Sequence, residues 1–159
     1  MLKDINGYLI TRNIRQRYLV KVRPFLGAGV QCMYDYSKPT IRIFDPEVIV
    51  LHVGTNELNS PKKSSEIAKS IIDLAASLKT CTNRIVISLI VPRGDDLNNK
   101  ASEVNDRLKN MCLNRNYLYI DHSDSINVAD HVNDGNLHLN KYGKAVLAKD
   151  FTNFLGNMD

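Results

Sequence analysis

The stretch that decides the fold is Glu47–Val53 (EVIVLHV), a nearly continuous apolar run that leads directly into Gly54, Thr55 and Asn56. A run this apolar is expected in a strand that is covered on both faces, as the strands of parallel sheets are. The residues that follow it place a short polar side chain at the carboxyl edge of the sheet. An Asn amide there can donate a hydrogen bond to a developing oxyanion, but Gly and Asn are also common turn residues. Taken alone, the segment favours the turn.

Other apolar segments predict the remaining strands, because they are short, rich in β-branched and aromatic residues, and bounded by turn residues. They lie at Tyr18–Phe25, Arg84–Val91 and Tyr117–Asp121.

Helical periodicity occupies the sequence between and after these strands. Ser60 followed by Pro61 predicts the cap and first residue of one helix. Strands that alternate with helices predict βαβ units and a parallel sheet with helices on both faces. The 159 residues suit a single domain, 1–159, with one core. The apolar helical faces run over Ile67–Leu78, Val104–Cys112 and Val146–Leu155.

Composition limits the class of protein. The formal net charge is +4, a mild excess that demands no anionic partner. Cys32, Cys81 and Cys112 are odd in number and widely spaced, which predicts reduced thiols in a cytoplasmic protein. No apolar run reaches the roughly 20 residues that a membrane helix needs. His122 and His131 have no metal-ligand spacing around them, so we expect neither a metal nor another cofactor.

A second segment, residues 134–140 (DGNLHLN), precedes the last predicted helix. His138 beside Asp134 suits a general base with a carboxylate partner. The alternative is a surface histidine next to a helix cap, with Asn140 as the cap.

Together the two segments are more specific than either alone. The order of His52–Leu58 (HVGTNEL), alternating α/β sequence and DGNLHLN resembles the SGNH/GDSL hydrolase family over essentially the whole chain. The sequence of these motifs is most similar to that of the SGNH-like domains of animal mobile-element proteins. The resemblance implies a three-layer α/β/α sandwich with a parallel sheet of about five strands, similar to flavodoxin. It also implies ester or thioester hydrolysis through a serine acyl-enzyme, with a small-molecule ester as substrate.

The resemblance assigns roles to four residues of this sequence. His138 would be the base, and Asp134 the candidate group that orients it. Gly27 and Asn56 would be two of three oxyanion donors.

Two departures from the family pattern qualify these roles. The family's first block is a strand that ends in Gly-Asp-Ser, and Met1 stands where the residue after that serine should be. We therefore expect the chain to be N-terminally truncated, to lack the first strand and the nucleophile, and to be inactive by itself. The family aspartate usually lies three residues before the histidine, where this chain has Gly135. Asp134 lies one residue further away.

Two other functions remain open at this stage. One is a non-catalytic module that binds a ligand in the old acyl pocket. The other is weak contact with nucleic acid through an early basic cluster, although such clusters are more often solvated surface. The sequence predicts no membrane partner and sets no oligomeric state. The basic residues are Arg12, Arg15, Arg17, Lys21 and Arg23.

Overall fold

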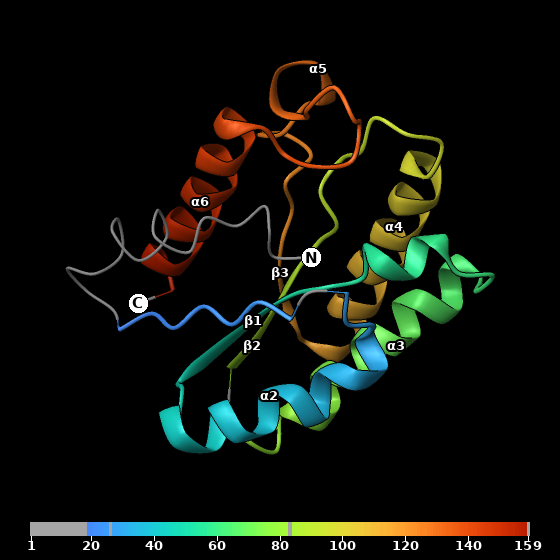
Figure 1. Ribbon diagram of the computed structural model, residues 1–159. Helices are drawn as coiled ribbons and strands as arrows, with labels where there is room; N and C mark the ends of the chain where they lie inside the picture. The colour runs from blue at the N-terminus through green and yellow to red at the C-terminus, as the bar shows by residue number, and fades with distance from the viewer. Residues whose placement is uncertain (1–18, 26, 83, 159) are drawn as a thin grey trace.

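A computed structural model of the chain describes residues 19–25, 27–82 and 84–158. Helices and strands alternate along it, as Figure 1 shows. In chain order the elements are α2 (Val30–Phe44), β1 (Val48–His52), the 3-10 helix η1 (Asn56–Asn59), α3 (Ser64–Leu78), β2 (Arg84–Ser88), α4 (Asn98–Arg115), β3 (Leu118–Ile120), α5 (Val128–His131) and α6 (Lys141–Gly156).

The described sheet has three parallel strands in the order β1-β2-β3. Its register pairs His52 with Ser88, and Ser88 with Ile120. The carboxyl ends of the strands therefore lie side by side at one edge. The parallel α/β architecture predicted from the sequence is confirmed, and three of the four predicted strands form, each slightly shorter than expected.

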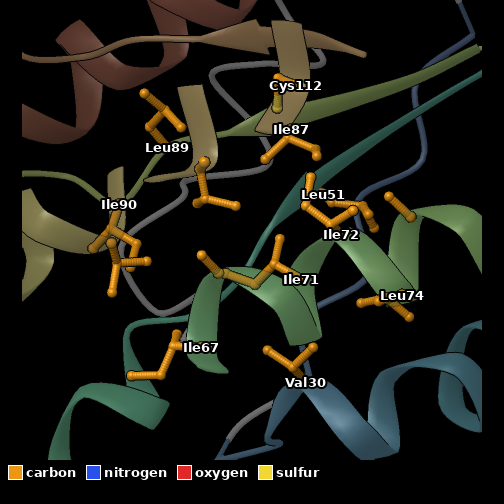
Figure 2. Packing of buried hydrophobic residues seen from close by; sticks show 14 of the residues in the cluster. Val30, Leu51, Ile67, Ile71, Ile72, Leu74, Ile87, Leu89, Ile90 and Cys112 are labelled. Atoms are coloured by element: carbon orange, nitrogen blue, oxygen red, sulfur yellow. The ribbon is translucent and has the colours of Figure 1, made fainter. Parts of the chain in front are cut away.

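One face of the sheet packs against α2, α3 and α4. Ile71 and Ile72 of α3 point toward Leu51 of β1 and Ile87 of β2 in Figure 2, with Val30 of α2 on the far side of α3. Ile71 and Ile72 are each at most 1 % exposed. The apolar periodicity of the sequence thus identified the buried face of α3 correctly.

The opposite face of the sheet packs against α6. Side chains alternate along a strand, so Val86 points away from Ile87 and joins a second cluster with Ile120, Leu147 and Phe151. Figure 1 shows α6 on the other side of the strands from α3 and α4. The two clusters make the molecule a three-layer α/β/α sandwich.

Several predicted boundaries were wrong. Tyr18 lies outside the described residues, and 19–25 form an extended segment without strand pairing, although Val20 packs on the second cluster. A strand needs a paired neighbour, which β-propensity does not supply. Helix α3 begins at Ser64 rather than Pro61, because the Glu66 carboxylate accepts a hydrogen bond from the Lys63 amide at 2.7 Å and closes the first turn there.

Helix α2 was not predicted, and Pro39 within it explains why. Proline inside a helix removes a backbone donor and usually ends or bends the helix. Here Val30 and Ile41 are buried against α3, and tertiary packing outweighs the local preference.

Among the described residues, no helix is both long and apolar enough to cross a membrane.

Candidate functional site

The turn that contains Gly27 lies against η1. The Asn56 side-chain amide donates a hydrogen bond to the Ala28 carbonyl at 3.0 Å. The buried Glu57 carboxylate accepts a hydrogen bond from the Val30 amide at the start of α2. Gly27 has φ of 71°, a left-handed conformation that favours glycine. The structure therefore brings together the segments of two sequence-predicted residues, Gly27 and Asn56. The two residues that form the contact, Ala28 and Asn56, are 28 positions apart in the sequence.

The chain leaves β1 through Gly54, which makes the sharp exit toward η1. Its φ is 110°, and a Cβ atom there would lie 2.8 Å from Cδ1 of Ile71. Only glycine satisfies both the backbone conformation and the close approach of α3. This exit aims Thr55 and Asn56 at the carboxyl edge of the sheet.

A small pocket lies between this exit and the Gly27 turn. Among the described residues that line it there is no serine or cysteine, and Thr55, which is 7 % exposed, is the only one of them with a side-chain hydroxyl. The lining residues are Phe25, Ala28, Met33, His52, Val53, Gly54, Thr55 and Asn56.

His138 lies half-buried in the loop before α6. Its carbonyl accepts a hydrogen bond from the Asn133 amide at 2.8 Å, and its own amide donates to Asn133 Oδ1 at 3.3 Å. Asp134 is exposed. The roles of His138 and Asp134 stay predictions.

Asn140 is the N-cap of α6, as one interpretation of the sequence held. Its side-chain oxygen accepts hydrogen bonds from the amides of Tyr142 and Gly143, both at 2.9 Å. Its amide nitrogen donates to the Asp130 carbonyl at 2.8 Å. The cap therefore holds the loop that carries His138 on the first turn of α6.

Beneath the pocket, a chain of hydrogen bonds crosses the sheet. His52 Nδ1 lies 2.7 Å from Ser88 Oγ, and Ser88 Oγ lies 2.8 Å from His122 Nε2. His122 Nδ1 in turn lies 2.8 Å from the Asp150 carboxylate, which also accepts a hydrogen bond from the Ser125 hydroxyl. We call His52, Ser88, His122 and Asp150 the polar chain.

The polar chain is shielded from solvent at its centre. Ser88 and His122 are each 1 % exposed. The ring of Phe151 stands edge-on to both imidazoles, with centroids 6.0 Å from His52 and 5.6 Å from His122. Burial, together with the nearby His122, lowers the pKa of His52 from its usual 6.5 to about 3. His52 is therefore neutral at physiological pH.

No sequence pattern assigned a role to the side chains of His52, Ser88 or His122. A signal was available, since all three are polar residues at the carboxyl ends of adjacent strands of a parallel sheet. Ser88 interrupts the apolar run RIVISLIV, and His122 is the second residue after the end of β3. No sequence pattern pointed to Asp150, which lies in the third turn of α6.

The sequence also led to expectations about metal ligands, cysteines and a basic cluster, and the structure describes only some of these residues. In the described residues no group of three His, Cys, Asp or Glu side chains could hold a metal ion. All three cysteines are free, and Cys32 is exposed, Cys81 half-buried and Cys112 buried. Arg12, Arg15 and Arg17 of the basic cluster lie outside the described residues, so the nucleic-acid contact stays a prediction.

The fold of this chain is similar to the folds of three solved structures whose names place them among lipolytic proteins and esterases. A member of the lipolytic G-D-S-L family from Veillonella parvula is similar over 98% of this chain and 92% of its own, with TM-score 0.79 and 20% identity. A GDSL-like lipase from Bacteroides thetaiotaomicron matches over 96% of this chain and 83% of its own, with TM-score 0.79 and 12% identity. An acetylxylan esterase from Geobacillus stearothermophilus matches over 92% of this chain and 78% of its own, with TM-score 0.75 and 14% identity.

No protein-family model and no curated protein matches the sequence. At these identities the structural likeness establishes the fold alone. The chain has the α/β fold of the SGNH/GDSL hydrolases, as the resemblance of its sequence implied.

Proposed function

We propose that the chain is an SGNH-type ester hydrolase domain that binds the acyl carbonyl of its substrate between Gly27 and Asn56. The observation that carries the proposal is the contact of Asn56 with the Gly27 turn. An Asn amide has two hydrogens, and the bond to the Ala28 carbonyl uses one of them. That bond orients the amide, and the second hydrogen serves as donor to an oxyanion, together with the Gly27 backbone amide.

The chemistry proposed is acyl transfer through a serine. The serine oxygen attacks the ester carbonyl, His138 takes its proton and later returns it to the leaving alcohol, and water completes hydrolysis. Asp134 orients His138, or a backbone carbonyl does so in its place. No described residue that lines the pocket is a serine, so we propose that the chain by itself does not turn over and that a preceding Gly-Asp-Ser strand supplies the nucleophile.

The test compares the 159-residue chain with the same chain extended at its amino end by a strand ending in Gly-Asp-Ser. A fluorophosphonate probe should label only the extended chain, which should also hydrolyse p-nitrophenyl acetate. Labelling of the shorter chain would show that it already holds a nucleophile, and a folded extended chain that stays unlabelled would refute the proposal.

Within the active extended chain, Asn56→Ala tests the oxyanion donor. Removing one such donor should lower kcat by about a hundredfold, with KM changed much less. Asn59→Ala is the matched control, because Asn59 lies at the exposed end of the same 3-10 helix and should leave kcat unchanged. Equal effects of the two variants would argue against the assignment of Asn56.

The absence of a serine or cysteine among the described pocket residues also favours a second candidate, a non-catalytic ligand-binding module. A ligand that binds only the folded state raises the melting temperature. Acetylated sugars or simple esters should then stabilise the 159-residue chain without being hydrolysed, and the extended chain should gain no activity.

A further inference from the structure

The polar chain fixes where its protons lie. A carboxylate only accepts hydrogen bonds, so His122 must carry a proton on Nδ1 to bond Asp150. When His122 is neutral, its Nε2 is an acceptor and the Ser88 hydroxyl donates to it. That hydroxyl has a single hydrogen, so Ser88 Oγ can only accept from His52 Nδ1. His52 then carries its proton on Nδ1, and its Nε2 has a lone pair.

The lone pair of His52 lies at the accessible end of the polar chain. His52 is half-buried and lines the pocket beside Ala28 and Asn56, whereas Ser88 and His122 are buried. His52 Nε2 hydrogen-bonds to no described residue. A water or hydroxyl group in the pocket can therefore donate to this nitrogen.

We propose that the polar chain is a proton relay, with His52 as its base in the pocket and the His122–Asp150 pair as the place where the charge is stored. The O–H bond of a bound water or hydroxyl group breaks, and its proton forms a new bond to His52 Nε2, which leaves a hydroxide or alkoxide in the pocket. His52 releases its Nδ1 proton to Ser88 Oγ, and Ser88 passes its own proton to His122 Nε2. Each residue of the polar chain that gains a proton gives one up, except His122, which ends as an imidazolium.

The end points of this transfer differ in how well they hold a positive charge. Charge on His52 itself is disfavoured by burial and by His122. Charge on His122 lies 2.8 Å from the Asp150 carboxylate, which α6 places against the imidazole and the Ser125 hydroxyl steadies. Of the neighbouring charges, Asp121 is already paired with Lys109 at 2.6 Å. The relay thus takes up a proton in the pocket and places the resulting positive charge on His122, beneath the pocket.

Ser88 is a relay member and not a nucleophile, because both sides of its hydroxyl are occupied and it is 1 % exposed. The relay also differs from the acyl-transfer base proposed above, which is His138. It is independent of the proposed function, since the position of its protons can be measured without any substrate.

The experiment follows the histidine tautomers by long-range ¹H–¹⁵N spectra of the ¹⁵N-histidine chain, from about pH 8 to about pH 4, where histidines titrate. In one transition, His122 should become an imidazolium while His52 changes from the Nδ1–H to the Nε2–H tautomer and stays neutral. A His52 that keeps one tautomer while His122 titrates, or that becomes a cation in the same transition, would overturn the relay.

Variants separate a relay from mere packing. Ser88→Ala should let His122 titrate while the His52 tautomer no longer follows it, and Ser88→Thr should restore the coupling. Ser123→Ala, which changes an exposed serine next to His122, should behave as the wild type.

If Ser88→Ala does not fold, Asp150→Asn provides the test: the protonation of His122 and the tautomer change of His52 should move together to lower pH. Coupling that survives loss of the Ser88 hydroxyl, or a His52 change that stays at its original pH in Asp150→Asn, would refute the proposal.

Discussion

Gly54 is the residue whose replacement we expect to disturb the site most directly. Its φ of 110° is strained for any other residue, and a Cβ atom would also lie 2.8 Å from Ile71 Cδ1 and 3.2 Å from Ile90 Cδ1. Gly54→Ala should therefore lower the free energy of unfolding by about 2 kcal/mol. Urea denaturation followed by circular dichroism measures the change.

Gly156→Ala is the control for this substitution. Gly156 ends α6, and a Cβ atom there would have nothing within 4 Å. Alanine in a helix is favoured over glycine, so stability should stay the same or rise by less than about 1 kcal/mol. A Gly54→Ala protein as stable as Gly156→Ala would contradict the close packing of Gly54 against α3.

His52 should make the stability of the chain depend on pH. Its folded pKa of about 3 lies below the unfolded value of 6.5, so the folded state resists its protonation. This contribution is complete above pH 6.5 and is lost as pH falls toward 3, with a slope of at most about 1.4 kcal/mol per pH unit. Urea unfolding at several pH values should show the loss.

His52→Asn isolates that contribution, because its amide does not titrate. The variant should be less stable than the wild type at neutral pH, since it leaves a gap beside Phe151. Its stability should fall less steeply between pH 6.5 and 4. Parallel curves for the two proteins would show that His52 titrates normally in the folded state.

At the scale of elements, the cap of α6 determines where the His138 loop meets the rest of the molecule. Asn140→Ala removes the acceptor for two helix amides and the donor to the Asp130 carbonyl. It should cost about 1 kcal/mol of unfolding free energy. Asn153→Ala is the matched control, because Asn153 is exposed within the same helix and should change stability by less than about 0.5 kcal/mol. Equal losses in both variants would contradict the capping role.

The elements also show how far the sequence alone could lead. The apolar runs at β1 and β2 and the helical periodicity of α3 predicted both type and location, because each of these segments buries the face that its pattern describes. The extended segment 19–25 was predicted as a strand, because propensity reports local preference and not whether a neighbour is available for pairing. Helix α2 was missed because Pro39 argues locally against a helix that packing against α3 stabilises.

Of the candidate site, too, the sequence predicted one part and missed another. Asn56 and Gly27 were predicted because their short segments resemble motifs of the SGNH/GDSL family, and the structure brings these segments together. The polar chain was missed because its members are single polar residues in four separate segments: β1, β2, the loop after β3, and α6. Only the strand register places His52 beside Ser88, and only the packing of α6 brings Asp150 to His122.

At the scale of the whole molecule, the two clusters lie on opposite faces of the same three strands, and this predicts a single unfolding transition. Val86 packs into the cluster on the α6 side, while Ile87, the next residue, packs into the cluster on the α3 side. Separating either layer exposes one face of β2, so neither cluster is stable without the other. Residues 1–159 should therefore unfold as one domain.

Thiol labelling can test this with one probe in each cluster. Cys112 is 0 % exposed in the first cluster, and burial raises its pKa to about 11, so it should react with Ellman's reagent only when the protein unfolds. Ala148→Cys places a second thiol in the other cluster, where Ala148 is 1 % exposed. In a background without Cys32 and Cys81, both thiols should become reactive at the same urea concentration, which should equal the midpoint measured by circular dichroism.

The chain with Cys32 restored is the control, and it should show an additional fast labelling phase in the absence of urea, because Cys32 is exposed. Two separate labelling midpoints would mean that the α6 layer opens independently and that the chain is not one cooperative unit.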